Sequence, residues 1–168
     1  MKALWALGIA VVAVAACVLL ISILASRDSG SVDGASGPGV TEADRGSQRL
    51  GEGAPPTPAS APAKPPTSGN HRAEAVERDN TALTDDQLLE ALQLGNVVIA
   101  YDGAAPTGLQ ADAFTPDLAA AGQAVILDKR PGVGAIQALA WRHRLKATGP
   151  DDPRLQEFID AYLGQGPG

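Results

Sequence analysis

Apolar and polar positions divide the chain into three successive parts. Residues 4–25 are a run of 22 side chains without one charge. The next stretch is rich in glycine, proline, serine and threonine, with 15 of its 43 positions being glycine or proline, and apolar periodicity returns only after it. This pattern predicts an N-terminal transmembrane anchor (1–26), a disordered tether (27–69) and a small folded domain (70–168).

The N-terminal apolar run has the length of a membrane-spanning helix. At 1.5 Å per residue it would extend ~33 Å, which matches the hydrocarbon thickness of a bilayer. Trp5 suits the lipid–water interface near one end. The positive charges of Lys2 and the amino terminus favour an N-terminus in the cytoplasm. We therefore expect a single-pass protein of the cell membrane, with residues 4–25 in the bilayer and an extracytoplasmic C-terminal domain.

Two other interpretations of this run stay open. A cleavable signal peptide has a shorter apolar core of about 7 to 15 residues, although Ala25 would permit cleavage. Residues 14–17 (VAAC) are similar to a lipoprotein signal, in which Cys17 would carry the lipid. Against that interpretation, the chain after Cys17 stays apolar, whereas a lipoprotein tether turns polar at once. All three interpretations place the rest of the chain across the membrane.

The composition of residues 27–69 predicts a disordered tether. A GASGPG stretch is typical of flexible coil, and the later APPTPASAPAKPP is typical of a stiffer polyproline II spacer. Such a composition buries too little apolar surface to offset the entropy lost on ordering. The tether would hold the domain away from the bilayer, or act as a linker without a length requirement.

The folded domain opens with a helix followed by a strand. The residues TDDQ at 84–87 form a capping box, and leucines follow at helical spacing until Gly95. Asn96 to Tyr101 is short, apolar and β-branched, which predicts a buried strand.

Helical and strand patterns alternate through the rest of the domain. The expected elements are a helix starting at Thr115-Pro116 and stopping at Gly122, a strand from Ala124 to Leu127, a turn over 130–134, a strand from Ile136 to Leu145 and a final helix that starts after Asp152-Pro153 and stops at Gly164. A helix over 136–146 is the alternative for the last strand. The order predicts an α+β fold, in which helices cover a small mixed three-stranded sheet and the third strand is antiparallel to the second.

Charge and cysteine content exclude several classes of function. The net charge is −6, and residues 66–168 hold 14 acidic against 8 basic side chains. This balance argues against nucleic acid as a partner. The one cysteine, Cys17, lies in the apolar run, so the domain has no thiol nucleophile, disulfide or cysteine metal site. No other nucleophile stands in a recognisable motif, which favours a non-enzymatic function.

Several short pieces of the domain occur in a characteristic order. They are Pro65–His71 (PPTSGNH), Leu92–Tyr101 (LQLGNVVIAY), Ala140–Arg142, Phe158–Tyr162 and Gly166–Pro167. Together they resemble the bacterial family known as domain of unknown function 3105, over about residues 65–167. The resemblance implies an anchored extracytoplasmic protein and no established activity.

One motif of that family is degenerate in this chain. The family pattern His-x-Leu-Glu-His-Gly corresponds here to residues 90–95, which read EALQLG. The resemblance implies that the two histidines of the pattern would form a metal or acid–base cluster with the histidine of PPTSGNH. Of those histidines this chain retains His71.

His71 is the main candidate for chemistry. As a functional residue it would be a metal ligand or a general base, with Glu90 nearby. As a structural residue it would bind a buried backbone group and fix the end of the tether, and we favour this interpretation. A zinc site formed by His71 and His143 lacks further ligands. A metal at His71, in a metal-binding domain or a degenerate metal-assisted enzyme, is the alternative.

Basic side chains near the C-terminal end of the domain form a candidate interaction face. In a strand, side chains two residues apart point to the same side, and a neighbouring turn could extend the face. The residues are Lys129, Arg130, Arg142, Arg144 and Lys146. They would receive an anionic envelope protein, or they would be the solvated side of an antiparallel strand. The sequence thus predicts a membrane-anchored interaction or accessory module.

Overall fold

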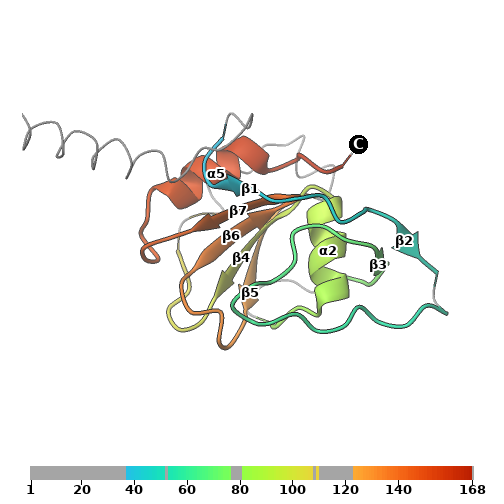
Figure 1. The fold of residues 1–168 in the computed structure, drawn as a ribbon. Coiled ribbons are helices and arrows are strands. Elements are labelled where there is room, and N and C mark those ends of the chain that lie inside the picture. Colours follow the sequence, from blue (N-terminus) through green and yellow to red (C-terminus); the bar gives the residue numbers. More distant parts are fainter. Residues whose placement is uncertain (1–36, 52, 77–80, 108, 110–122, 168) are drawn as a thin grey trace, which may run out of the picture. The chain divides into compact units, whose positions relative to one another are not determined.

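The computed structural model describes residues 37–167, apart from 52, 77–80, 108 and 110–122 (Figure 1). The predicted anchor over 4–25 and the helix predicted from Pro116 to Gly122 lie outside the described residues. Within the described part, no helix is long and apolar enough to cross a membrane. The elements in chain order are β1 (Val40–Thr41), β2 (Arg49–Leu50), β3 (His71–Arg72), α2 (Asp85–Gln93), β4 (Val97–Tyr101), β5 (Val125–Lys129), β6 (Gln137–Ala140), β7 (His143–Lys146) and α5 (Arg154–Tyr162).

The centre of the fold is a mixed five-stranded sheet with the order β1-β7-β6-β4-β5. Strands β4 and β5 are parallel, whereas β4–β6, β6–β7 and β7–β1 are antiparallel pairs. A separate parallel pair joins β2 to β3. The α+β class is as predicted, but the sheet has five strands rather than three. The third predicted strand also pairs with β4 and not with β5.

The two helices cover opposite faces of the sheet (Figure 1). One apolar cluster joins Val97 and Ile99 of β4 to Phe158 of α5. A second cluster joins Val98, the intervening residue, to Leu88 of α2. Because both faces of β4 are covered, all five of its residues are buried, which explains why its sequence is apolar without polar alternation.

Helix α2 begins and ends as its sequence predicts. The Thr84 hydroxyl accepts a hydrogen bond from the backbone N–H of Gln87, and the Gln87 side chain accepts one from the backbone N–H of Thr84. After the helix, Gly95 has a φ of +84°. A Cβ there would lie 3.1 Å from the carbonyl carbon of Gly164. The position therefore requires glycine, and it brings the C-terminal segment against the end of α2.

The strand predicted from Ile136 to Leu145 is instead the hairpin β6–β7. The chain turns at Trp141 and Arg142, and Arg142 has a left-handed φ of +63°. This turn lacks the glycine or asparagine that usually signals a hairpin. The backbone N–H of Arg142 donates to the carbonyl of Thr67, and its carbonyl accepts from the N–H of Glu42. These two hydrogen bonds stabilise the left-handed conformation of Arg142. Their partners, Thr67 and Glu42, lie far from Arg142 in the sequence.

The structure also differs from the prediction of a disordered tether over residues 27–69. Residues 37–69, here called the N-terminal strap, lie along the folded domain and contain β1 and β2. Val40 of β1 pairs with Arg144 of β7. The strap binds through polar groups and ion pairs rather than through an apolar stripe. Composition measures apolar content, so it carries no signal for such bonds.

Removing the carboxylate of Glu42 tests whether the strap is part of the folded unit. Arg144, whose side chain is 5% exposed, donates to both oxygens of that carboxylate. We expect Glu42→Ala to leave Arg144 partly unpaired and to cost about 2 kcal/mol of unfolding free energy. Thermal denaturation should show a midpoint lower by roughly 5–8 °C.

Asp151→Ala is the matched control, because Asp151 is an exposed acid in a turn. If Glu42→Ala and Asp151→Ala unfold at the same temperature, the strap is not held on the domain by this ion pair.

Candidate functional site

His71 lies fully buried at the start of β3, with an exposed fraction of 0%. Its Nδ1 is 3.0 Å from the carbonyl oxygen of Gly69, and its Nε2 is 3.2 Å from Oε2 of Glu90 on α2. The ring also lies next to the indole of Trp141, with 6.5 Å between ring centroids. Each ring nitrogen thus faces an oxygen of the protein, and the ring joins β3 to α2.

The carboxylate of Glu90 is shared between His71 and an arginine of the strap. Arg49 of β2 places Nη2 2.6 Å from Oε1 and Nε 3.1 Å from Oε2 of Glu90. The β2–β3 pairing sets Arg49 opposite His71 and so brings both to the same carboxylate. A bidentate arginine is a strong partner for a carboxylate. Both oxygens of Glu90 are therefore already engaged.

The two histidines of the chain do not form a common site. His143 stacks on Tyr162 of α5, with 4.2 Å between ring centroids and 20° between the planes. His71 lies on the opposite side of the sheet, by Trp141 of the α2 cluster. Burial lowers the pKa of His143, and the positive charge of Arg142 lowers it further. Among the described residues, no group of three or more His, Cys, Asp or Glu could hold a metal ion.

Two of the five basic residues predicted to form an interaction face are buried. Arg130 is 8% exposed and forms ion pairs with Asp128 and Asp85. Arg144 is 5% exposed and pairs with Glu42. Both side chains therefore hold parts of this chain together rather than facing solvent.

The exposed members of that set do not share one face of the sheet. Lys129 of β5 lies on the same side as Leu127, which packs against the α5 cluster. Lys146 of β7 alternates with Leu145 of that cluster and so points to the other side. Strands β6 and β4 also separate the two strands. The alternation expected along a single strand does not produce a continuous basic stripe here.

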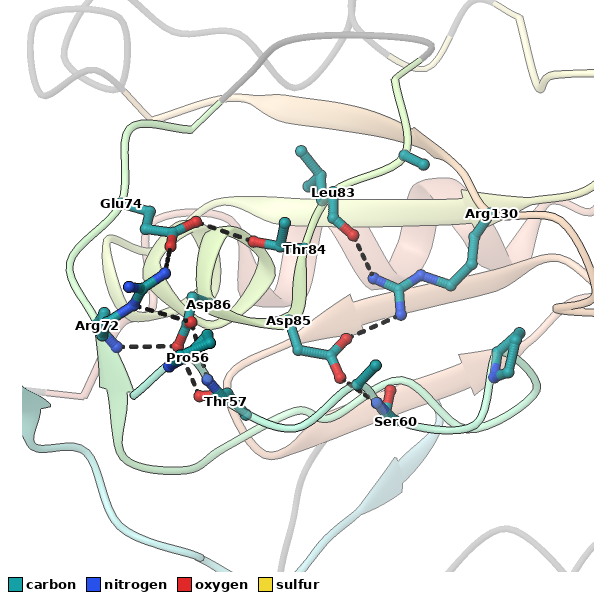
Figure 2. Close-up of a pocket in the computed structure, with 13 residues that line it drawn as sticks. Pro56, Thr57, Ser60, Arg72, Glu74, Leu83, Thr84, Asp85, Asp86 and Arg130 are labelled. Atoms are coloured by element: carbon teal, nitrogen blue, oxygen red, sulfur yellow. Dashed lines mark hydrogen bonds and ion pairs between the residues drawn. The ribbon is translucent and has the colours of Figure 1, made fainter. Parts of the chain in front are cut away.

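A pocket of about 340 Å³ lies between the strap and the N-terminal end of α2 (Figure 2). It is called the strap pocket below. Its lining residues are Pro56, Thr57, Ala59, Ser60 and Pro62 of the strap, Arg72, Glu74 and residues 82–86 around β3 and α2, and Arg130 after β5. In Figure 2 the charged side chains of the lining point toward one another and toward the strap.

Asp86 is the main polar contact between the strap and α2. It accepts hydrogen bonds from the backbone N–H of Thr57 at 3.0 Å and from the Thr57 hydroxyl at 2.6 Å. It also accepts from the backbone N–H of Arg72. Burial by itself raises the pKa of Asp86, but the hydrogen bonds from Thr57 and Arg72 outweigh it and hold the pKa below its ordinary value.

Asp85 makes a parallel contact one residue earlier. Its carboxylate accepts from the backbone N–H of Ser60 and from Nη1 of Arg130, the latter at 3.0 Å. The sequence suggests helix-capping acids at both positions and no contact with residues 56–60. A capping box is a local pattern, whereas the partners of these acids lie 14 to 45 residues away, so sequence spacing carried no signal for them.

Most of this folded unit matches a known protein family. A family model described as "Protein of unknown function (DUF3105)" matches residues 56–168. The chain belongs to the DUF3105 family. The match includes residues 56–69 of the strap, which the composition had assigned to a tether. Searches of the curated proteins and of the solved structures return no match.

The structure shows how the motifs of this DUF3105 chain fit together. The PPTSGNH piece runs beside the β6–β7 turn, where Thr67 binds Arg142. Position 90, where the family pattern has histidine, holds a glutamate in contact with His71. Position 94, where the pattern has its second histidine, is Leu94 with an exposed fraction of 47%. In this chain the cluster is thus reduced to one histidine in contact with one glutamate.

The pH dependence of stability should report on Asp86. A carboxyl group whose pKa is lowered on folding stabilises the folded state above its ordinary pKa, here 3.8, and loses that effect as the pH falls through the folded pKa. At pH 7 we expect Asp86→Asn to cost about 1–3 kcal/mol. Below pH 3.8 the difference from wild type should shrink, because the Asp86 carboxyl of the unfolded chain then takes up a proton that the folded state, with its lowered pKa, resists. Urea unfolding at pH 7, 5 and 2.5 measures this, with Asp151→Asn as control. An equal difference at all three pH values would contradict the account.

Proposed function

We propose that this DUF3105 protein is a non-enzymatic interaction or accessory domain, held outside the cytoplasm by a membrane anchor formed by residues 4–25. The observation that carries the non-enzymatic part is the pairing of the buried charges. Every buried charged side chain of the described residues is in an ion pair with another side chain of the chain. These are Asp85, Asp86, Glu90, Asp128, Arg130, Arg144 and Asp152.

Such pairing supports a structural use of the charges. Catalytic acids and bases usually keep a perturbed pKa in a cleft where a substrate can reach them. The carboxylates of Asp85 and Asp86 border the strap pocket, but they bind backbone N–H groups of the strap. His71 is fully buried between Gly69 and Glu90. The domain is therefore better suited to present a surface than to transform a substrate.

The membrane part of the proposal is supported by sequence. The uncharged run of residues 4–25 has the length of a spanning helix, and Lys2 precedes it. An exported domain is consistent with the lack of cysteine after residue 17, because nothing in it depends on a reduced thiol.

Cell fractionation tests the anchor and its orientation. The full chain with a C-terminal epitope should sediment with membranes and resist extraction at high pH. Protease added outside spheroplasts should remove the epitope, because the domain is extracytoplasmic. Deleting residues 4–25 should move the protein to the cytosolic fraction. An epitope that is protected in intact spheroplasts would refute the proposed orientation.

A metal site at His71 is the second candidate function. The observation in its favour is the contact of 3.2 Å between Nε2 of His71 and Oε2 of Glu90, which brings two ligand types together. The bidentate contact of Arg49 with the same carboxylate opposes it.

Elemental analysis of the purified full chain discriminates the two functions. We expect no stoichiometric metal, and we expect His71→Ala to lower the unfolding free energy by about 2–3 kcal/mol through loss of a buried, hydrogen-bonded side chain. Zinc or copper at one equivalent, lost in His71→Ala but kept in His143→Ala, would instead establish the metal site.

A further inference from the structure

Residues 55–60 of the strap, called the cis segment below, bind α2 in the way a peptide ligand would. Their sequence is PPTPAS, and the three prolines have no backbone N–H. Two of the remaining N–H groups, those of Thr57 and Ser60, donate to Asp86 and Asp85. The Thr57 hydroxyl adds a third bond, at 2.6 Å. The two carboxylates of α2 therefore bind two backbone N–H groups and one hydroxyl group of the cis segment.

The spacing of these contacts fits an extended proline-rich chain. A polyproline II helix has three residues per turn, so residues three apart face the same side. Thr57 and Ser60 are three apart, and both face α2 (Figure 2). Adjacent carboxylates at the start of one helix are thus matched to one turn of the cis segment. A segment of this kind is largely preformed, which reduces the entropy lost on binding.

The carboxylates are oriented by groups outside the cis segment. Asp86 accepts from the backbone N–H of Arg72 at 2.9 Å. Asp85 is paired with Arg130, which is itself fixed by Asp128 at 2.9 Å and by the carbonyl of Leu83. The binding groups would therefore keep their positions if the cis segment left.

The cis segment does not fill the space beneath it. The strap pocket of about 340 Å³ is partly open to solvent, and its lining includes the exposed Ala59 of this segment and the buried Leu83 before α2. The hydroxyl of Ser60 is buried and has no hydrogen-bond partner among the described residues. Because Ala59 lines the pocket and is exposed, a larger apolar side chain at its position has room to cover more of the pocket lining.

We propose that the strap pocket is a binding groove for an extended, proline-rich segment of a partner protein, and that the cis segment occupies it in competition. The partner segment would carry threonine or serine at the position of Thr57, a free N–H three residues later, and a larger apolar side chain at the position of Ala59. This inference rests on the proposed function, because it assigns a partner class to the interaction domain.

A synthetic peptide of residues 54–62 (APPTPASAP) tests the groove directly. In the full chain the tethered cis segment has a high effective concentration, in the millimolar range for short flexible connections. We therefore expect weak binding of labelled peptide to wild type. In a full chain whose residues 55–60 are replaced by a glycine–serine segment of equal length, binding measured by fluorescence anisotropy should be at least tenfold tighter.

Variants of the protein and of the peptide provide the controls. The chain in which a glycine–serine segment replaces residues 55–60 is called the opened chain. Adding Asp86→Asn to the opened chain should weaken peptide binding at least tenfold, whereas adding Asp151→Asn should leave peptide binding unchanged. A peptide with leucine in place of Ala59 should bind more tightly than the parent peptide. Equal or weaker binding of the leucine peptide would overturn the assignment to a partner, because the groove would then fit this chain's own segment best.

Absence of saturable peptide binding to the opened chain would overturn the groove itself, provided that thermal denaturation shows that chain to be folded. If it is not folded, Thr57→Val serves for the same measurement, because it removes the hydroxyl bond and keeps the N–H bond. Membrane fractionation does not depend on the groove. If the protein fractionates with membranes but the opened chain binds no peptide, this inference is refuted, whereas the proposal of a membrane-anchored domain is not.

Discussion

The fold depends on ion pairs and hydrogen bonds that join the strap to buried charged side chains of the rest of the domain. Glu42 reaches Arg144, Arg49 reaches Glu90, and the N–H groups of residues 57 and 60 reach two further carboxylates. Removing one partner from such a pair costs more than the pair contributes, because a buried charge is left without compensation. The strap can remain poor in apolar residues and still be ordered.

Local signals in the sequence were sufficient to predict three elements of the fold. The capping box of α2, the apolar run of β4 and the apolar face of α5 each depend on residues within a few positions of one another. The β6–β7 turn and the strap could not be predicted in this way. Arg142 adopts a left-handed conformation because Thr67 and Glu42 bind it, and they lie 75 and 100 residues earlier. Sequence patterns that span a few residues carry no trace of such partners.

For the candidate site, too, local sequence features were informative and distant contacts were not. His71 stood out because it is the one histidine of the family set that this chain retains, and in the structure its Nε2 lies 3.2 Å from Oε2 of Glu90. Of the five basic residues, Arg130 and Arg144 are buried, which the sequence did not indicate. Alternation along a strand shows that Arg144 and Lys146 share a side, but it does not show that the strap covers Arg144 and leaves Lys146 exposed. Burial is a property of the covering segment, so it must be observed in three dimensions.

The pairing of β1 with β7 has a consequence for the order of folding. Val40 and Arg144 are 104 positions apart, so their contact closes a loop that contains almost the whole domain. Closing so long a loop before its interior is structured is entropically unfavourable. Strand β1 is synthesised early, yet it can pair only after β7 of the last hairpin exists. During synthesis β1 therefore stays unpaired until the late part of the domain has formed, whereas residues 49–60 contact α2, which is synthesised before that hairpin.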